Sequence, residues 1–174
     1  MSVLNVAELA LRAPELRAGE EIELTGEVLC ARDAAHKRLC ALIAQGLPLP
    51  VELKNACIYY AGPTPARPGG LCGAFGPTTS ARMDRFAPLL YERGVLATVG
   101  KGERGEEVKR SIVARGGLYL VAIGGAGALA AEHVSSVREL AFSDLGCESL
   151  KLLEFEKFPL FVGIDSRGND IFAR

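Results

Sequence analysis

The feature that most constrains the fold is a series of short apolar segments separated by helical patterns and by glycine and proline. Residues 21–29 alternate polar and apolar side chains, which is typical of a half-buried strand. Residues 56–61, 95–99 and 118–123 are short and mostly apolar, and the first and last of them have the composition of buried strands. Strands that alternate with helical segments predict an α/β fold, and we find no linker that would divide residues 1–174 into more than a single domain.

Helical patterns lie between these strands. Asp33 is a good N-cap for a first helix, and Gly46 ends that helix. We expect two further helices over residues 79–93 and 103–115 and, after the strand at 118–123, a helix of small residues. The chain then closes with predicted strands at 134–142 and 149–164 and a turn at 165–169.

Composition narrows the classes of protein to which the chain can belong. It has 174 residues, 49% of them hydrophobic, and a formal net charge of −1. These values argue against a disordered chain and against electrostatic binding to nucleic acid. No apolar run approaches the length that spans a bilayer, and residues 1–15 lack the basic start of a secretory signal. We therefore expect no membrane association and a cytoplasmic location.

The cysteines do not form a recognisable ligand set. There are five, Cys30, Cys40, Cys57, Cys72 and Cys147, and none of their spacings is C-x-x-C. An odd number without a secretory signal also argues against a disulfide framework. We expect no metal site built by this chain alone.

The segment Gly76–Asp84 carries the most chemical information. Its Gly-Pro start forces a bend, and Thr78 and Thr79 are good residues for the beginning of a helix. Arg82 follows one turn later and offers a planar fork of donors that matches a carboxylate or phosphate. An ordinary capped helix with a solvated arginine is the alternative interpretation.

Three further segments accompany it: residues 31–39 and 100–102, each after a predicted strand, and residues 58–63. In this order and spacing, the chain resembles the beta subunit of class I, iron–sulfur-dependent fumarate hydratases and of L-tartrate dehydratases. The resemblance extends from about Gly26 to the closing segment 158–169.

The resemblance implies a fold, an activity and a partner. It implies a swivelling β/β/α domain that closes over a partner domain and an enzyme that interconverts fumarate and L-malate. The alternative substrate pair is L-tartrate and oxaloacetate. It also implies a 4Fe–4S cluster held by a separate alpha subunit and not by this chain. The choice between a homodimer and a heterotetramer is left open.

The reaction requires removal of a proton next to a carboxylate and expulsion of hydroxide. A cluster iron with an open coordination site is a suitable Lewis acid for the hydroxyl group. Preorganised donors must stabilise the charge that develops on the other carboxylate. Arg32, Arg82 and Lys101 lie at predicted strand or helix ends, with Asp33 and Thr79 as further substrate-binding candidates. Surface charge is the alternative role for the three cations.

Two residues are candidates for the proton acceptor. The family pattern T-T-x-x-R places the reactive threonine at Thr78, whose hydroxyl would need Lys101, Arg82 and the helix N-terminus to stabilise its alkoxide. Capping of the helix is the competing role for Thr78. His36 could relay a proton or hold Asp33 and Arg32 in place, and a purely structural histidine on a helix face is the alternative.

One motif favours a different class of protein. Residues 125–130 fit G-x-G-x-x-A after a buried strand, which is the context of a dinucleotide fingerprint. The unit lies late in the chain, and the acidic residue expected after the next strand is not evident. We therefore interpret residues 124–127 as packing or as backbone amides near the site. A non-catalytic anion- or nucleotide-binding module that also uses Lys101 remains the second hypothesis.

Overall fold

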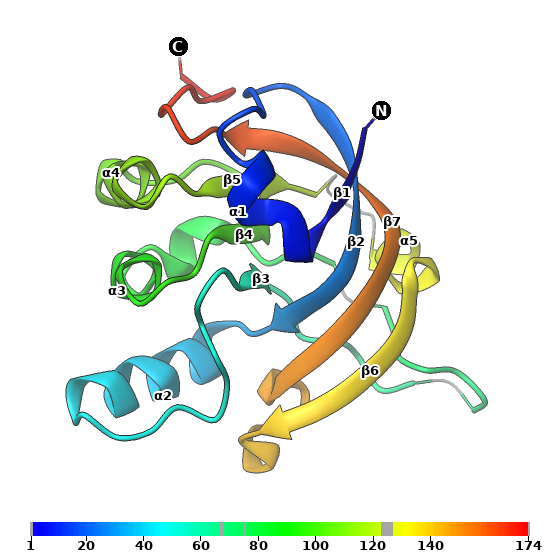
Figure 1. Ribbon diagram of the computed structural model, residues 1–174. Helices are drawn as coiled ribbons and strands as arrows, with labels where there is room; N and C mark the ends of the chain where they lie inside the picture. Colours follow the sequence, from blue (N-terminus) through cyan, green and yellow to red (C-terminus); the bar gives the residue numbers. More distant parts are fainter. Residues whose placement is uncertain (1, 67, 75, 123–126, 174) are drawn as a thin grey trace.

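Seven strands form one sheet in the computed structural model, which describes residues 2–66, 68–74, 76–122 and 127–173 (Figure 1). The strand order is β1-β2-β3-β4-β5-β7-β6, with an additional pairing between β2 and β7. The strands are β1 Ser2–Asn5, β2 Glu21–Cys30, β3 Cys57–Tyr59, β4 Ala97–Gly100, β5 Leu118–Val121, β6 Val134–Ala141 and β7 Leu150–Ile164.

The pairing of β2 with β7 closes the sheet into a barrel-like ring. The two strands run antiparallel, with Glu21 opposite Phe161 at one end and Cys30 opposite Lys151 at the other. Strands β2, β3, β4 and β5 are mutually parallel neighbours, and β7 returns antiparallel to both β5 and β2. The carboxyl ends of four parallel strands consequently lie at one edge of the ring.

Both faces of the short parallel strands are buried. In β3, Cys57 and Tyr59 contact the core inside the ring, whereas Ile58 contacts a second core under the helices. In β5, Leu118 and Leu120 face inward and Tyr119 faces the helices. Burial on two faces explains why these strands are continuous apolar runs in the sequence, whereas β2 alternates.

The helices are distributed unevenly around the sheet. The α-helices are α1 Leu9–Arg12, α2 Asp33–Ala44, α3 Ala87–Glu92, α4 Glu106–Arg115 and α5 Gly127–Glu132; short 3-10 helices are η1 Val6–Glu8, η2 Ser80–Met83 and η3 Ser143–Glu148. Helices α2, α3 and α4 lie together on the side of β3, β4 and β5, and α5 lies apart from them near β6 (Figure 1). No helix of the described residues is long and apolar enough to cross a membrane.

The α/β fold expected from the sequence is confirmed, and its strands fall close to the expected ranges. The swivelling motion and the domain limits stay predictions.

One helix differs from the prediction: residues 79–93 form η2 and the separate helix α3. A continuous helix would place Pro88 in its interior, where the missing N–H and the ring clash break the helical hydrogen-bond pattern. Starting the helix at Ala87 instead puts Pro88 in the first turn, where proline is tolerated.

The expected helix at 103–115 also begins later, at Glu106. The amide of Gly105 donates 2.6 Å to Asp84 Oδ2, so a side chain from another segment holds the residue before the helix. The first residues of the chain, for which no element was predicted, form β1, η1 and α1. Strand β1 pairs in parallel with β2.

Candidate active site

The carboxyl ends of the parallel strands bring together residues that are far apart in the sequence. Arg32 and Asp33 follow β2, Gly62 follows β3, and Lys101 follows β4. In α/β sheets this edge is where ligands bind, because strand ends and the following loops converge there. The sequence analysis named three of these four residues as site candidates.

The segment 76–84 crosses this edge and is held by backbone hydrogen bonds. The Thr78 amide donates to the Tyr60 carbonyl (2.6 Å), and the Ser80 amide donates to the Lys101 carbonyl (2.9 Å). Thr79 and Lys101 also pair as an isolated parallel bridge. The loop therefore extends the sheet between β3 and β4, and backbone pairing brings Thr79, the residue after Thr78, next to Lys101.

Gly100 is what permits this close approach. A Cβ atom at Gly100 would collide with Ser80 Oγ and would lie 3.0 Å from the Tyr60 ring. Because the colliding atoms belong to buried residues, they cannot simply move aside. A glycine at the end of β4 is therefore required for the loop to rest on the sheet.

Arg82 and Asp33 form a two-pronged ion pair across the edge. Arg82 Nε lies 3.2 Å from Asp33 Oδ1, and Nη2 lies 2.8 Å from Oδ2. The Arg82 side chain is 53% exposed, so the pair contributes about 0–1 kcal/mol to stability. Its main effect is on geometry, because a bidentate contact fixes the direction of the guanidinium.

Arg32 is held between two carboxylates. Its Nε lies 3.6 Å from Asp33 Oδ2 and 3.1 Å from Glu148 Oε1. A Cβ atom at Gly62 would lie 2.9 Å from Arg32 Cδ, so the side chain passes closely over the end of β3. Asp33 thus lies between Arg32 and Arg82.

Glu148 was not identified from the sequence. It ends η3 and is separated from β7 by Ser149 alone, whereas Arg32 comes just after β2. Antiparallel pairing places the end of one strand beside the start of the other, and Cys30 opposes Lys151. The two charges meet only because β2 pairs with β7, and no local signal in the turn around Glu148 indicates this.

His36 lies beneath the edge, fully buried. Its Nδ1 is 2.9 Å from the Arg32 carbonyl, and since a carbonyl only accepts, Nδ1 carries the proton. Nε2 is buried without a hydrogen-bond partner among the described residues. The ring stacks edge-on against Tyr60 at 5.2 Å and lies 5.9 Å from the Phe86 ring. Burial lowers the pKa of His36 to about 4, so the imidazole is neutral at pH 7.

The structure gives the cap position of the short helix η2 to Thr79, not to Thr78. The Thr79 side chain makes no capping hydrogen bond to any described residue. Within the described part of the chain, Thr78 Oγ1 and Lys101 Nζ likewise have no side-chain hydrogen bond or ion pair, and both residues are partly exposed. Capping therefore does not account for Thr78.

The side chains of the described residues can be compared with what an iron–sulfur cluster requires of its ligands. Residues 2–66, 68–74, 76–122 and 127–173 contain no group of three His, Cys, Asp or Glu side chains placed to hold a metal ion. Cys30 and Cys57 lie in the core inside the ring, where burial raises the pKa of each thiol to about 12 and disfavours the thiolate that metals require. Cys147 is exposed, and no cysteine pair in the described residues is bonded.

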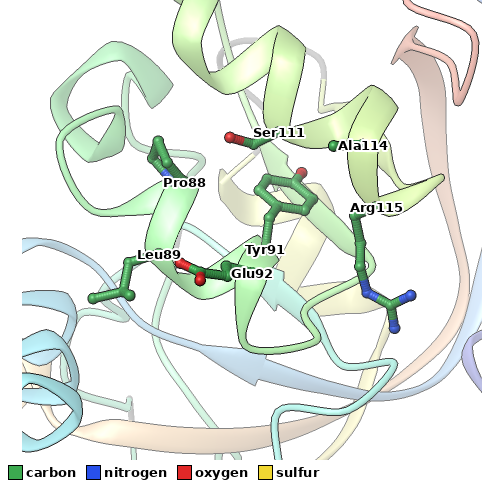
Figure 2. Close-up of a pocket in the computed structure, with 7 residues that line it drawn as sticks. All are labelled: Pro88, Leu89, Tyr91, Glu92, Ser111, Ala114 and Arg115. Atoms are coloured by element: carbon green, nitrogen blue, oxygen red, sulfur yellow. The ribbon is translucent and has the colours of Figure 1, made fainter.

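A hollow of about 470 Å³ lies between α3 and α4 (Figure 2). Pro88, Leu89 and Arg115 line it. Tyr91 lines it as well, and its hydroxyl donates to the Leu118 carbonyl at 2.8 Å. None of the candidate residues predicted from the sequence lines this hollow.

The glycine motif is only partly described. Residues 123–126 lie outside the described part of the chain, and α5 begins at Gly127. A Cβ atom at Gly76 would lie 3.7 Å from Gly127 Cα, so the start of α5 is next to the segment that carries Thr78. This contact agrees with packing near the site.

Comparison with known proteins identifies a matching family. Residues 3–174 match the family described as the fumarase C-terminus. The chain is 39% identical to fumarate hydratase 2 of Leishmania major over 158 residues, which are 90% of this chain and 28% of that protein. It is 36% identical to the anaerobic class I fumarate hydratase of Escherichia coli over 169 residues, 96% of this chain and 31% of that protein.

A shorter relative matches over most of its length. The chain is 35% identical to the L(+)-tartrate dehydratase subunit beta of Escherichia coli over 164 residues, 91% of this chain and 80% of that subunit. The chain thus spans less than a third of the fumarate hydratases compared above but most of the length of a beta subunit.

The burial of His36 predicts a pH dependence of stability. The unfolded chain takes up a proton at His36 below its ordinary pKa of 6.5, whereas the folded chain does so only near pH 4. Stability present above pH 6.5 is therefore lost as the pH falls from 6.5 to 4, by roughly 3 kcal/mol for this shift. Urea unfolding at a series of pH values measures the loss.

A His36→Gln chain should lose less stability over the same pH interval, because the amide does not titrate. His133→Gln is the control and should retain the steep loss. If His36→Gln and the wild type lose stability equally steeply between pH 6.5 and 4, the buried imidazole is not the cause.

Proposed function

Because the chain belongs to the fumarase C-terminus family, we propose that it is the beta subunit of a two-subunit hydro-lyase that interconverts fumarate and L-malate. The observation that carries the proposal is the convergence of Arg32, Arg82, Lys101 and Thr78 at one edge of the parallel strands. Coverage of a tartrate dehydratase beta subunit over 80% of its length supports a separate subunit.

The two arginines supply what a dicarboxylate needs. Each carboxylate matches a guanidinium fork, and Asp33 orients both Arg32 and Arg82. These cations also stabilise the charge that develops on the carboxylate next to the reacting carbon. Thr79, exposed and paired with Lys101 through its backbone, is a further substrate contact in this proposal.

Thr78 is the proposed proton acceptor. In the dehydration of L-malate, the carbon next to one carboxylate gives its proton to Thr78 Oγ1, and the C–H electron pair forms the double bond as the hydroxyl group leaves. A threonine hydroxyl is a weak base, so a nearby positive charge is needed to favour its deprotonated form. Lys101, whose backbone pairs with that of Thr79, is the candidate for this role together with Arg82.

For His36 we propose a positioning role and not that of a catalytic acid or base. It is fully buried and donates Nδ1–H to the Arg32 carbonyl, so it does not face the edge where substrate would bind. We propose that His36 positions Arg32 at the start of α2 and does not contact the substrate.

The cluster and the partner follow from the same reasoning. Since the described residues of this chain do not fit a 4Fe–4S cluster, we propose that a cysteine-bearing alpha subunit holds it and completes the site. When bound there, the cluster supplies a Lewis acid for the substrate hydroxyl group. The subunit stoichiometry and the cytoplasmic location expected from the sequence stay predictions.

A second candidate substrate is L-tartrate, with oxaloacetate as its product. The specific observation in its favour is the match to a tartrate dehydratase beta subunit over most of that protein. Both substrates carry two carboxylates and an eliminated hydroxyl group, so the same arginines and Thr78 serve either reaction.

We predict that the purified chain is colourless and inactive on its own. Adding a cysteine-bearing alpha subunit with iron and sulfide should produce hydration of fumarate, measured by the loss of its ultraviolet absorbance. Running the same assembled pair with L-tartrate separates the two substrates by kcat/KM. A 4Fe–4S spectrum from this polypeptide alone would contradict the assignment of the cluster to the partner.

We predict that Arg82→Lys is almost as damaging as Arg82→Ala. Lysine keeps the positive charge but not the two-pronged contact with Asp33 that orients the Arg82 side chain. Loss of one preorganised donor costs about 10²–10³ in rate. The measurement is kcat/KM of the assembled enzyme. Arg85→Lys is a matched control in the same segment, because Arg85 lies over the Phe86 ring instead of bonding Asp33. If Arg82→Lys keeps most of the activity, Arg82 does not clamp the substrate.

We predict that Thr78→Ala abolishes turnover while the melting temperature barely changes. Thr79→Ala should be much milder, and Thr78→Ser should retain activity because it keeps the hydroxyl. Exchange of the substrate C–H proton with deuterated solvent reports the abstraction step directly. A cap would instead cost about 0.5–2 kcal/mol of stability on removal. If Thr78→Ala exchanges the proton at the wild-type rate but melts several degrees lower, Thr78 is structural.

A further inference from the structure

We infer that Arg104 is a positioning residue, which holds the segment carrying Thr78 and Arg82 against the segment carrying Lys101. The inference rests on the proposed function for its effect on turnover, but the contacts that carry it belong to this chain alone. Arg104 lies between β4 and α4, close to a glycine on either side, and nothing in its sequence surroundings indicated a special role.

Arg104 is a charged residue that is almost entirely buried, with 4% of its surface exposed. Its Nε donates to Asp84 Oδ1 at 2.7 Å, Nη1 donates to Thr98 Oγ1 at 3.1 Å, and Nη2 donates to the Tyr60 hydroxyl at 3.3 Å. The guanidinium also lies over the rings of Tyr60 (5.3 Å) and Tyr119 (4.9 Å). The planar donor group therefore has a partner on each side and is held in one orientation.

Asp84 joins the two segments at the other end of this ion pair. One carboxylate oxygen accepts from Arg104 and the other accepts from the Gly105 amide at 2.6 Å. Asp84 comes two residues after Arg82, whereas Arg104 and Gly105 follow Lys101 in the loop after β4. One carboxylate thus ties the end of the Thr78–Arg82 segment to the Lys101 loop by two hydrogen bonds.

Tyr119 connects the same two segments a second time, through Ser80 of the first and Gly102 of the second. Its hydroxyl lies 2.8 Å from the Gly102 carbonyl and 2.9 Å from Ser80 Oγ. Since the carbonyl only accepts, Tyr119 donates to Gly102 and accepts from the Ser80 hydroxyl. Tyr119 projects from β5, which is part of the sheet, so this tie fixes both segments relative to the ring and not only to each other.

An ion pair between a buried arginine and a partly buried carboxylate, as Arg104 forms with Asp84, contributes little to stability alone. Removing two charges from water carries a large penalty, and apolar side chains of similar volume often replace such a pair without loss. An apolar cluster, however, does not supply directional contacts such as hydrogen bonds. The Arg104 network fixes the separation and orientation of two loops, and reacting groups misplaced by about 1 Å lose on the order of 10² in rate.

The test compares Arg104→Met with Lys109→Met in the assembled enzyme. Lys109 Nζ lies 2.6 Å from Asp170 Oδ2. The Asp170 side chain is 3% exposed and the Asp84 side chain is 22% exposed, so both variants remove a cation from a carboxylate that is at least partly buried. The Lys109 pair connects α4 to the C-terminal turn and touches neither segment of the site. Both enzymes are assayed at a temperature at which unfolding curves show them fully folded.

We expect Arg104→Met to raise KM for the dicarboxylate and to lower kcat, with a combined loss of about 10² in kcat/KM. Lys109→Met should keep wild-type values of both. Arg104→Lys keeps a positive charge opposite Asp84 but loses the donors to Thr98 and Tyr60. Its kcat/KM should therefore fall between those of Arg104→Met and the wild type. Equal kcat/KM for folded Arg104→Met and Lys109→Met would overturn the inference. If Arg104→Met does not fold, Asp84→Asn, which keeps the side-chain volume, replaces it in the same comparison.

A second readout uses the isolated chain and does not depend on turnover. The Ser80 amide donates to the Lys101 carbonyl, so its hydrogen exchange reports contact between the two segments. Exchange at Ser80 should accelerate in Arg104→Met and remain unchanged in Lys109→Met. If the wild-type assembly does not act on dicarboxylates, the proposed function fails while this exchange still decides the role of Arg104. Unchanged Ser80 exchange in folded Arg104→Met would show that Arg104 does not hold the loops together.

Discussion

The antiparallel pairing of β2 with β7 determines both the architecture of the sheet and the layout of the candidate site. It closes a set of parallel strands into a ring and creates an interior core that the strands fill from one face. It also places the residues after β2 beside those before β7. For this reason Arg32 Nε lies 3.1 Å from Glu148 Oε1. Closure and the shape of the candidate site are therefore consequences of one strand pair.

The site edge is supported from below by groups that are polar and buried. His36, Arg104 and Tyr119 each bond a residue of a surface loop or of the edge itself. The exposed pair of Arg82 and Asp33 contributes little free energy, whereas these buried contacts carry the cost of a lost partner if one is removed. Orientation at the surface is thus maintained by hydrogen bonds in the interior, where water does not compete for them.

Local patterns predicted most elements of the fold, because hydrophobic periodicity is a property of neighbouring residues. The alternation in β2 and the apolar runs of β3 and β5 were read correctly for this reason. The helix expected over residues 79–93 failed where two local signals conflicted. The apolar spacing favoured a single helix, but Pro88 required a break before it. Glu148 and Arg104 had no local signal at all, since their partners lie on other elements.

Composition, spacing and motifs were sufficient to predict the α/β class, the family and the residue types that can bind a dicarboxylate. Which of those residues come into contact depends on the tertiary structure. It paired the backbone of Thr79 with that of Lys101, buried His36 beneath Arg32, and left Thr79 in the cap position. Contacts between distant segments are set by strand pairing and by the packing of buried side chains. Neither can be deduced from a single local segment of the sequence.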